Sequence, residues 1–600
     1  MRRRTLLKHA GALPIGATLP AGEEARAAAE PFRRVRPSDP AWPSPSAWQS
    51  LNDATGGSLF RVESPLAACE SAPASTACEA VFRALKNPYA TGDTPALTQT
   101  TGWADAWISE PSAYAVKVRN TADVVAAVNF AREHRLRLVV KGGGHSYQGT
   151  SNAADSLLIW TRALDAIALH DAFVGVGCSQ APQTAVSVGS GNIWFHVYDA
   201  VMTRAGRYVQ GGGCATVGVA GLVQGGGFGS FSKRFGIAGA SLLEAEIVTA
   251  DGAVRIANDC TEPDLFWALK GGGGGTFGVV TRLTLRTHAL PDTLGGAFGV
   301  VAAPSDDAFR RLLERFVGFY ADALFNPSWG ETVAVGSGNR LGVSMVFQGM
   351  DQAAAERVWA PFLDWVHAAP GDFTITEPFR IFGLPGRRFW DASWLRANVP
   401  GLVISDDRPG APEGDVFWAG NLGEAGWFIH AYDSRWLPAS LLRPDGRTRL
   451  ADALFAASRQ WRVGLHTNKG LAGAPPEAIE AAGRTPMNPA VQEAFALAII
   501  ASGGPPARPG IAGHEPDLAR ARAEATRIGA AMTEMQKVAD GGSYVSETNY
   551  FNPAWRESYW GPNYPRLRAV KDRYDPGGLF FVHHGVGSED WSADGFTRVA

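Results

Sequence analysis

The chain carries two glycine-dense stretches, and each contains a single nucleophilic side chain. The first, KGGGHSY at residues 141–147, directly follows an apolar run at residues 138–140 that predicts a strand. The second, GGGCATVGVAG at residues 211–221, continues into GGGFG at residues 225–229. Glycines let a backbone approach an anionic ligand with its N–H groups exposed. A glycine turn or a lone histidine is more often structural, so it is the pair of loops that points to a bound cofactor.

This pair of loops resembles the flavin-binding loops of the vanillyl-alcohol-oxidase superfamily, specifically those of its berberine-bridge-enzyme-like branch. In that branch, a histidine of the first loop and a cysteine of the second both bond to one FAD. The resemblance covers most of the chain, including its C-terminal end, and it implies FAD bound covalently to His145 and Cys214. The alternative is that both are packed, unmodified side chains. The residues expected to border the cofactor are Lys141, Gly142, Gly143, Gly144, His145, Ser146, Tyr147, Gly213, Cys214, Thr216, Val217, Gly218, Gly221, Gly226, Gly227, Phe228, Gly229, Gly278, Val279, Val280, Asn563 and Tyr564.

Strand and helix patterns that alternate along the chain predict an α+β fold. An amphipathic run to residue 134 begins at Thr121, a predicted N-cap, and residues 244–256 predict a hairpin that turns at Asp251-Gly252. Residues 273–278 fit the pattern G-x-G-x-x-G, but a helical segment precedes them and a strand follows. A dinucleotide fingerprint needs the reverse order, which excludes a Rossmann fold. We interpret these glycines as another close backbone approach to FAD, as the resemblance implies.

The resemblance also implies the domain organisation. Residues 60–290 are expected to form a discontinuous, two-subdomain FAD-binding domain of the PCMH type, with its core at about 108–288. Beyond Pro291 the glycine loops end and aromatic residues become frequent, so residues 291–525 are expected to form an antiparallel substrate-domain sheet backed by helices. Residues 526–600 resemble the C-terminal segment that returns to the FAD domain and covers the flavin.

The N-terminus reads as a targeting signal. Arg3 and Arg4 precede a weakly apolar stretch that ends in small residues, so residues 1–29 are predicted to be a twin-arginine-type signal peptide. A basic tail is the alternative. This route carries folded proteins, which suits a protein that attaches its cofactor before export, and we therefore expect a periplasmic or extracellular location.

The chain has five cysteines. If Cys214 binds flavin, four remain, and Cys69 and Cys78 flank a loop short enough to close at little entropic cost, which predicts a disulfide. Cys178 and Cys260 are left open between free thiols and a further disulfide. Because no histidines and cysteines have the spacing of a zinc site, no metal site is predicted.

An alcohol needs a general base before it can give up hydride. In alcohol- and sugar-oxidising relatives this base is a tyrosine near the start of the C-terminal segment, and Tyr544 matches it best, with Glu547 and Tyr550 as reserves. A tyrosine titrates near pH 10, so neighbouring cations would have to lower its pKa. The alternative is a buried structural tyrosine. His466, in a polar cluster of the substrate domain, is the next candidate.

Val217 and Phe228, which both follow Cys214 in the sequence, refine the resemblance. Phe228 stands where many plant members carry a second active-site tyrosine, so the plant substrates cannot be transferred to this chain. Val217 matches the gatekeeper position that accompanies oxygen reactivity, which favours an oxidase.

The leading hypothesis is an exported, FAD-dependent oxidase that transfers hydride from an alcohol or sugar to flavin N5 and reduces oxygen to hydrogen peroxide. The alternatives are a dehydrogenase with another acceptor and a flavin-fold binding module without turnover. With a formal net charge of −3 the charge is nearly balanced, so nothing points to nucleic acid, and no apolar run approaches the roughly 20 residues of a membrane span. We expect a monomer.

Overall fold

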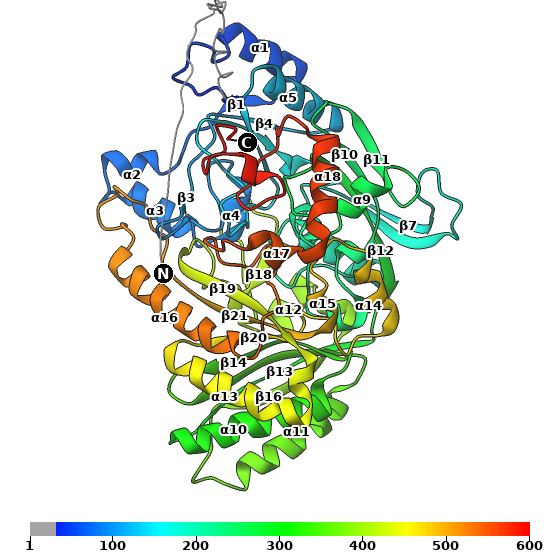
Figure 1. The fold of residues 1–600 in the computed structure, drawn as a ribbon, viewed down its shortest axis with the longest axis vertical. Helices are drawn as coiled ribbons and strands as arrows, with labels where there is room; N and C mark the ends of the chain where they lie inside the picture. The colour runs from blue at the N-terminus through cyan, green and yellow to red at the C-terminus, as the bar shows by residue number, and fades with distance from the viewer. Residues whose placement is uncertain (1–31, 600) are drawn as a thin grey trace, which may run out of the picture.

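The computed structural model describes residues 32–599, so the predicted signal peptide lies outside the described residues. Two smaller sheets lie in the upper half of Figure 1, and one large sheet with its helices lies in the lower half. The fold is α+β, as the sequence predicts.

The first small sheet is mixed, with its strands in the order β1-β4-β6-β5. β4, β5 and β6 are parallel, while β1 pairs antiparallel with β4. Helix α5 begins one residue after its cap, and this cap is Asn120 rather than Thr121, because the Asn120 side chain accepts the Asp123 N–H at 3.0 Å. The elements are α1 (Pro45–Ala54), β1 (Leu59–Arg61), β4 (Tyr114–Lys117), α5 (Thr121–Glu133), β5 (Arg137–Lys141) and β6 (Ser156–Trp160).

The second small sheet is antiparallel, in the order β11-β10-β12-β8-β7, with β9 also paired to β12. The predicted hairpin joins β10 to β11, and Gly252 takes the positive φ of +80° that its turn requires. The elements are β7 (Ile167–Phe173), β8 (Gln183–Gly189), α6 (Trp194–Tyr198), β9 (Arg207–Val209), α7 (Val219–Gln224), α8 (Ser232–Phe235), β10 (Leu242–Val248), β11 (Val254–Ala257), α9 (Pro263–Ala268) and β12 (Val279–Ala289).

The C-terminal segment packs back onto this second sheet, beside α9 in Figure 1. Trp560 and Leu567, which are fully buried, share one apolar core with Phe266 and Leu283. The buried Lys571 Nζ donates to the carbonyl of Thr276 at 2.7 Å, which ties the segment to a loop of the FAD domain. The FAD domain is therefore discontinuous, as predicted. The helices of this segment are α17 (Trp555–Tyr559) and α18 (Tyr564–Tyr574).

The large sheet has nine strands in the order β16-β13-β15-β14-β20-β21-β19-β2-β3. Neighbouring strands are antiparallel except β19 and β2. Its apolar face packs on helices that bury Phe309, Trp359 and Leu454. The strands are β13 (Thr293–Ala302), β14 (Trp329–Gly336), β15 (Arg340–Gln348), β16 (Thr374–Pro385), β19 (Phe428–Pro438), β20 (Val463–His466) and β21 (Ala494–Gly504), and the helices are α10 (Asp306–Phe319), α11 (Gln352–His367), α13 (Pro444–Gln460) and α16 (Leu518–Gln536).

Two short strands from early in the chain complete this sheet. β2 (Gly102–Trp103) pairs with β19, and β3 (Trp107–Ile108) pairs with β2. The substrate-domain sheet thus recruits residues from within the range 60–290. The remaining elements are α2 (Ala67–Ser71), α3 (Thr76–Ala84), α4 (Pro88–Asp93), α12 (Ala392–Asn398), β17 (Val403–Ser405), β18 (Val416–Trp418), α14 (Pro476–Gly483) and α15 (Ala490–Glu493).

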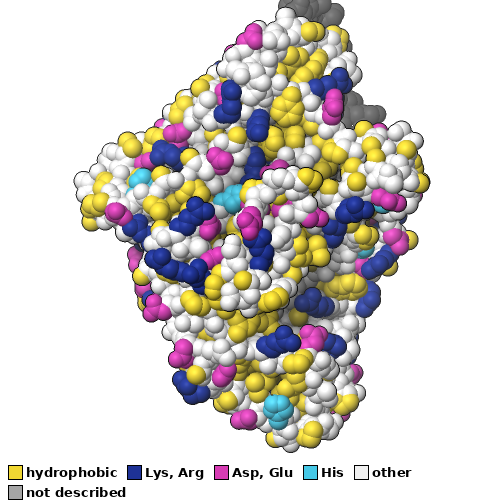
Figure 2. All heavy atoms as spheres, turned by 180° about the vertical axis from the view of Figure 1, so that it is seen from behind, with side chains coloured by type: hydrophobic (Ala, Val, Ile, Leu, Met, Phe, Trp, Pro, Cys, Tyr) yellow, Lys and Arg dark blue, Asp and Glu magenta, His cyan; other side chains and the backbone are white. Residues whose placement is uncertain are grey.

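Four of the five cysteines form disulfides. The predicted bond between Cys69 and Cys78 is present, and Cys178 pairs with Cys260, which settles the open alternative; Cys214 is free. Among residues 32–599, none of the helices combines the length and apolar character needed to cross a membrane. Charges of both signs are interspersed on the face in Figure 2.

Candidate active site

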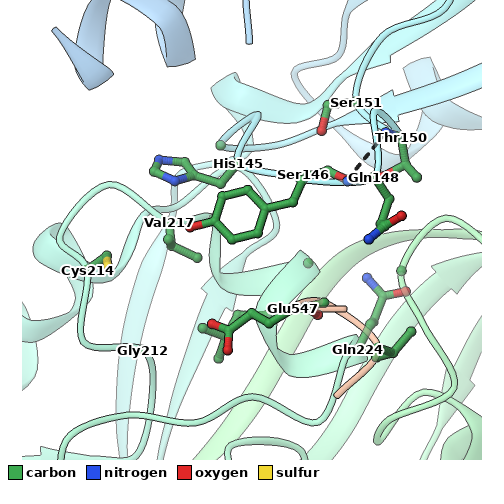
Figure 3. A pocket seen from close by; sticks show the side chains of 18 of the residues that line it. His145, Ser146, Gln148, Thr150, Ser151, Gly212, Cys214, Val217, Gln224 and Glu547 are labelled. Carbon is green, nitrogen blue, oxygen red and sulfur yellow. Dashed lines mark hydrogen bonds between the residues drawn. The ribbon is translucent and has the colours of Figure 1, made fainter. Parts of the chain in front are cut away.

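One cavity of about 590 Å³ lies where the two small sheets, the large sheet and the C-terminal segment meet. In Figure 3, His145 and Cys214 lie on two neighbouring loops along one side of it, and Glu547 reaches in from the C-terminal segment. The volume is typical of a site for a small molecule or cofactor.

The histidine loop leaves the end of β5. Gly144 has a φ of +75°, and a side chain there would come within 2.8 Å of the Lys141 side chain. The fully buried Lys141 ammonium donates to the carbonyls of Thr91 and Thr94, at 3.1 and 2.7 Å, and to that of Leu97. Lys141 therefore positions the loop from behind and does not border the cavity.

His145 is presented as a neutral imidazole. Its Nε2 lies 3.0 Å from the Thr216 hydroxyl of the cysteine loop, which joins the two loops directly. Burial, followed by the Lys141 charge, lowers the pKa of His145 to about 4. A neutral ring nitrogen carries the lone pair that a nucleophile needs.

The cysteine loop is held from the substrate domain. Trp418 donates its indole N–H to the Gly213 carbonyl at 3.0 Å, and the Asn421 amide lies 3.5 Å from Cys214 Sγ. Burial, followed by Glu424 and Glu331, raises the pKa of the Cys214 thiol to about 12. The thiol is therefore protonated near neutral pH, whereas the imidazole of the neighbouring loop is neutral and carries a free lone pair.

A third glycine loop, residues 273–276, closes another part of the cavity. Gly273 and Gly275 have φ values of +98° and +72°, which only glycine adopts readily. Gly221, at the facing edge of α7, borders the cavity and has open space where a side chain would stand. Bare backbone from this loop and from α7 thus borders the cavity.

Most of the predicted cofactor-bordering residues line this one cavity: Gly142, Gly143, Gly144, His145, Ser146, Tyr147, Gly213, Cys214, Thr216, Val217, Gly218, Gly221, Phe228, Gly278 and Val280. The others do not line it: Lys141, Gly226, Gly227, Gly229, Val279, Asn563 and Tyr564. For Gly229 the physical reason is its packing. A side chain there would collide with the Gly211 carbonyl at 1.9 Å, so this glycine serves loop-on-loop packing.

Tyr544 and Glu547 border the same cavity, next to each other. The Glu547 N–H donates to the Tyr544 carbonyl at 2.9 Å in a tight turn. Burial, followed by the Glu547 charge, raises the pKa of Tyr544. The sequence argument required neighbouring cations to lower this pKa, and the charged neighbour is instead a carboxylate. The Tyr544 ring meets Phe228 edge-on, with centroids 5.1 Å apart.

Of the two other candidates for the general base, His466 borders the cavity and Tyr550 does not. Tyr550 lies outside the cavity lining and stacks on His583, with ring centroids 3.7 Å apart. His466, at the end of β20, borders the cavity, and burial holds its pKa well below the usual value. Glu547 pairs with the Lys469 ammonium, which also borders the cavity.

Two further carboxylates in the lining were not predicted. Glu331 lies on β14 and accepts a hydrogen bond from the Ser230 hydroxyl, and Glu424 accepts one from the Tyr147 hydroxyl at 3.0 Å. Burial raises the pKa of both carboxyls. Both come from the substrate domain, far from the glycine loops in sequence, and no local pattern marks them. Other lining residues outside the predictions include Gln148, Gln224, Thr276, Asn421, Asn468, His583 and His584.

The residues present fit a flavin dinucleotide. Glycine backbone from three loops borders the cavity, as a pyrophosphate requires, and residues of the lining carry buried polar atoms without a partner in the described chain. These atoms include Gln224 Oε1 and Thr276 Oγ1. Buried polar atoms normally have hydrogen-bond partners, so a polar ligand is the expected complement. No group of three or more acidic, histidine or cysteine side chains in the described residues could hold a metal.

Comparison with known proteins decides the family. A family model of an FAD binding domain matches residues 112–258, and one described as berberine and berberine like matches residues 543–587. The chain is 31% identical over 500 residues to the FAD-linked oxidoreductase easE of Claviceps purpurea, covering 81% of this chain and 94% of that protein. The chain belongs to the vanillyl-alcohol-oxidase superfamily, in its berberine-bridge-enzyme-like branch.

Solved structures agree with this membership. The VAO-type flavoprotein MtVAO615 from Myceliophthora thermophila C1 superposes with a TM-score of 0.75 at 27% identity, covering 95% of this chain and 100% of that one. A carbohydrate oxidase from Microdochium nivale shares the fold, with a TM-score of 0.60 at 18% identity over 88% of this chain and 100% of that chain. This berberine-bridge-like protein is an FAD-dependent oxidoreductase.

Proposed function

We propose that this flavoprotein is an exported oxidase that binds FAD covalently through His145 and Cys214 and oxidises the CH–OH group of an alcohol or carbohydrate. The observation that carries the proposal is that both nucleophiles border the cavity that Tyr544 and Glu547 also border. When bound, FAD supplies the hydride acceptor and returns the electrons to oxygen as hydrogen peroxide.

The protein's own residues would manage position and protons. Neutral His145 and free Cys214 offer one bond each from neighbouring loops, which would hold the ring in one place. Burial raises the pKa of Tyr544, so it would accept the substrate hydroxyl proton as its own phenolic proton leaves, and Glu547, paired with Lys469, is the neighbouring carboxylate that would take that proton. Because burial raises the pKa of Tyr544, Tyr544 and Glu547 need to be tested side by side.

Two observations favour oxidase over dehydrogenase. Val217 borders the cavity beside Cys214, at the position that accompanies oxygen reactivity in the family. The Microdochium nivale neighbour is named a carbohydrate oxidase, which supports the same reaction class and leaves the substrate open.

Export is supported by the cysteine pairing. Both disulfides, Cys69–Cys78 and Cys178–Cys260, are typical of a protein that works in an oxidising compartment. Changing both Arg3 and Arg4 to lysine should strand the precursor in the cytoplasm, and normal accumulation outside it would contradict the twin-arginine route.

The test of the reaction class is a peroxide-coupled screen of the purified full chain over sugars and alcohols. A substrate that bleaches the flavin without air should form peroxide when air is admitted, and stopped-flow reoxidation should be fast. A flavin that substrate reduces but air does not reoxidise would favour the dehydrogenase. No reduction by any sugar or alcohol, with flavin fully loaded, would contradict the proposal.

A further inference from the structure

The cavity is acidic in its charged side chains. Its lining contains three carboxylates, Glu331, Glu424 and Glu547, one ammonium, Lys469, and no arginine. Burial is the first cause that lowers the pKa of every histidine in the lining, so these rings are neutral near pH 7: His145, His466, His583 and His584. Carboxyl groups therefore outnumber cations by three to one, and because burial raises the pKa of Glu331 and Glu424, a cation that enters would favour their ionised forms.

The single cation is already paired. Lys469 Nζ contacts Glu547 Oε2, so these two charges offset each other. Glu331 and Glu424 form no ion pair with any residue between 32 and 599 and have neutral partners only. For Glu331 Oε1 these are the Ser230 hydroxyl and, at 3.4 Å, the Asn468 amide, and for Glu424 the partner is the Tyr147 hydroxyl.

The backbone of Glu331 adopts a strained conformation where its side chain borders the cavity. Its φ is +69°, a region that residues with a side chain rarely adopt, and the Thr467 N–H and hydroxyl, both at 2.9 Å, donate to its carbonyl. Strain of this kind collects at functional sites. The strained residue brings its carboxylate within 3.2 Å of where a side chain on Gly213 would stand, directly beside Cys214.

Tyrosine rings lie beside Glu424. Tyr147, which donates to Glu424, packs against Tyr432 with ring centroids 5.3 Å apart, and both border the cavity. Carboxylates that lack a cation, placed beside tyrosine rings, form the environment that a protonated amine or quaternary ammonium prefers.

We infer that the substrate of this site carries a cationic nitrogen, which Glu331 and Glu424 recognise. The inference rests on the proposed function, which supplies the reaction, and it adds that the substrate is positively charged. A buried carboxylate is stabilised when a cation enters, while an anionic substrate would add to the negative charge. Sugars and alcohols with a protonated amino group fit this site, and sugar acids and phosphorylated sugars do not.

The test measures binding to the flavin-loaded full chain through perturbation of the flavin absorbance, which needs no turnover. The probes are three molecules of similar size: benzylammonium, benzyl alcohol and benzoate. We expect benzylammonium to bind about tenfold or more tightly than benzyl alcohol, the usual worth of a charge-assisted hydrogen bond, and benzoate to bind most weakly. Raising sodium chloride from about 50 to about 500 mM should weaken only the cation's binding.

Matched variants locate the effect. Glu331→Gln with Glu424→Gln should remove most of the preference for benzylammonium, whereas Glu377→Gln, an exposed residue paired with Arg340, should keep it. If the double variant does not load flavin, the wild-type series and its salt dependence decide the question. Equal binding of cation and neutral probe, or tighter binding of benzoate, would overturn the inference. Turnover of neutral alcohols without a cation preference would contradict this inference and leave the proposed oxidase intact. A cation preference without any turnover would contradict the proposed oxidase and leave this inference intact.

Discussion

The histidine loop and the cysteine loop each present one nucleophile to the cavity, but different parts of the chain hold them in place. The histidine loop is held by its own domain, through the buried Lys141 ammonium under carbonyls of residues 91–97, and its imidazole is neutral and ready. The cysteine loop is held by the substrate domain, through Trp418 and Asn421, and its thiol is protonated beside carboxylates. The difference teaches that attachment at Cys214 depends more on the substrate domain than attachment at His145, whose loop contacts that domain through the bond from Tyr147 to Glu424.

The largest effect is expected from removing both nucleophiles. His145→Ala and Cys214→Ala should each leave flavin attached through the other side chain after acid denaturation. The double variant should release all its flavin, because no covalent bond remains. The absorbance of the acid precipitate measures this. A double variant that stays yellow would show that a third residue bonds to the flavin.

Replacing Tyr544 by phenylalanine separates attachment from catalysis. The variant keeps the ring contact with Phe228 but loses the proton acceptor, so flavin reduction by substrate should slow by roughly 10²–10⁴-fold. Both covalent bonds should form normally. Rapid-mixing reduction kinetics measure the loss, and Glu547→Gln is the matched variant. A reduction rate within a few-fold of wild type in Tyr544→Phe would move the role to Glu547 or His466.

The pH dependence of attachment should distinguish the two nucleophiles. His145 has a pKa of about 4, so its nucleophilic neutral form already dominates at pH 6 and the rate of its bond should stay flat above that pH. Cys214 has a pKa of about 12, so its thiolate fraction, and the rate of its bond, should rise about tenfold per pH unit between pH 6 and 8. Adding FAD to apo single variants and following denaturation-resistant flavin over time measures each rate. Equal slopes would contradict the contrast between the loops.

The smallest effects should come from the loop supports. Trp418→Phe removes the indole donor to Gly213, so the cysteine-bonded fraction should fall a few-fold while the histidine-bonded fraction is unchanged. Trp427→Phe is the matched control, because that indole donates to Thr100 instead. Lys141→Met should lower the histidine-bonded fraction more than the cysteine-bonded fraction. Peptide mapping of the two attachments reads out both, and equal losses at both sites in either variant would contradict separate support.

Much of this site could be predicted from the sequence, because the glycine loops are local patterns that carry their nucleophiles with them. The strand before His145, the hairpin at Gly252 and the disulfide between Cys69 and Cys78 were predictable for the same reason. Glu331 was not, since its positive φ and its place beside Cys214 arise only when β14 packs against the FAD domain. The pairing of Cys178 with Cys260 spans 82 residues and likewise depends on tertiary structure.

The most direct test of the account is a tryptic map of the denatured, flavin-loaded wild-type chain. Trypsin should release His145 in peptide 142–162 and Cys214 in peptide 208–233. We predict one species whose mass joins both peptides through a single FAD. Recovery of both peptides free of flavin, or of FAD on only one of them, would contradict the claim that His145 and Cys214 share one flavin.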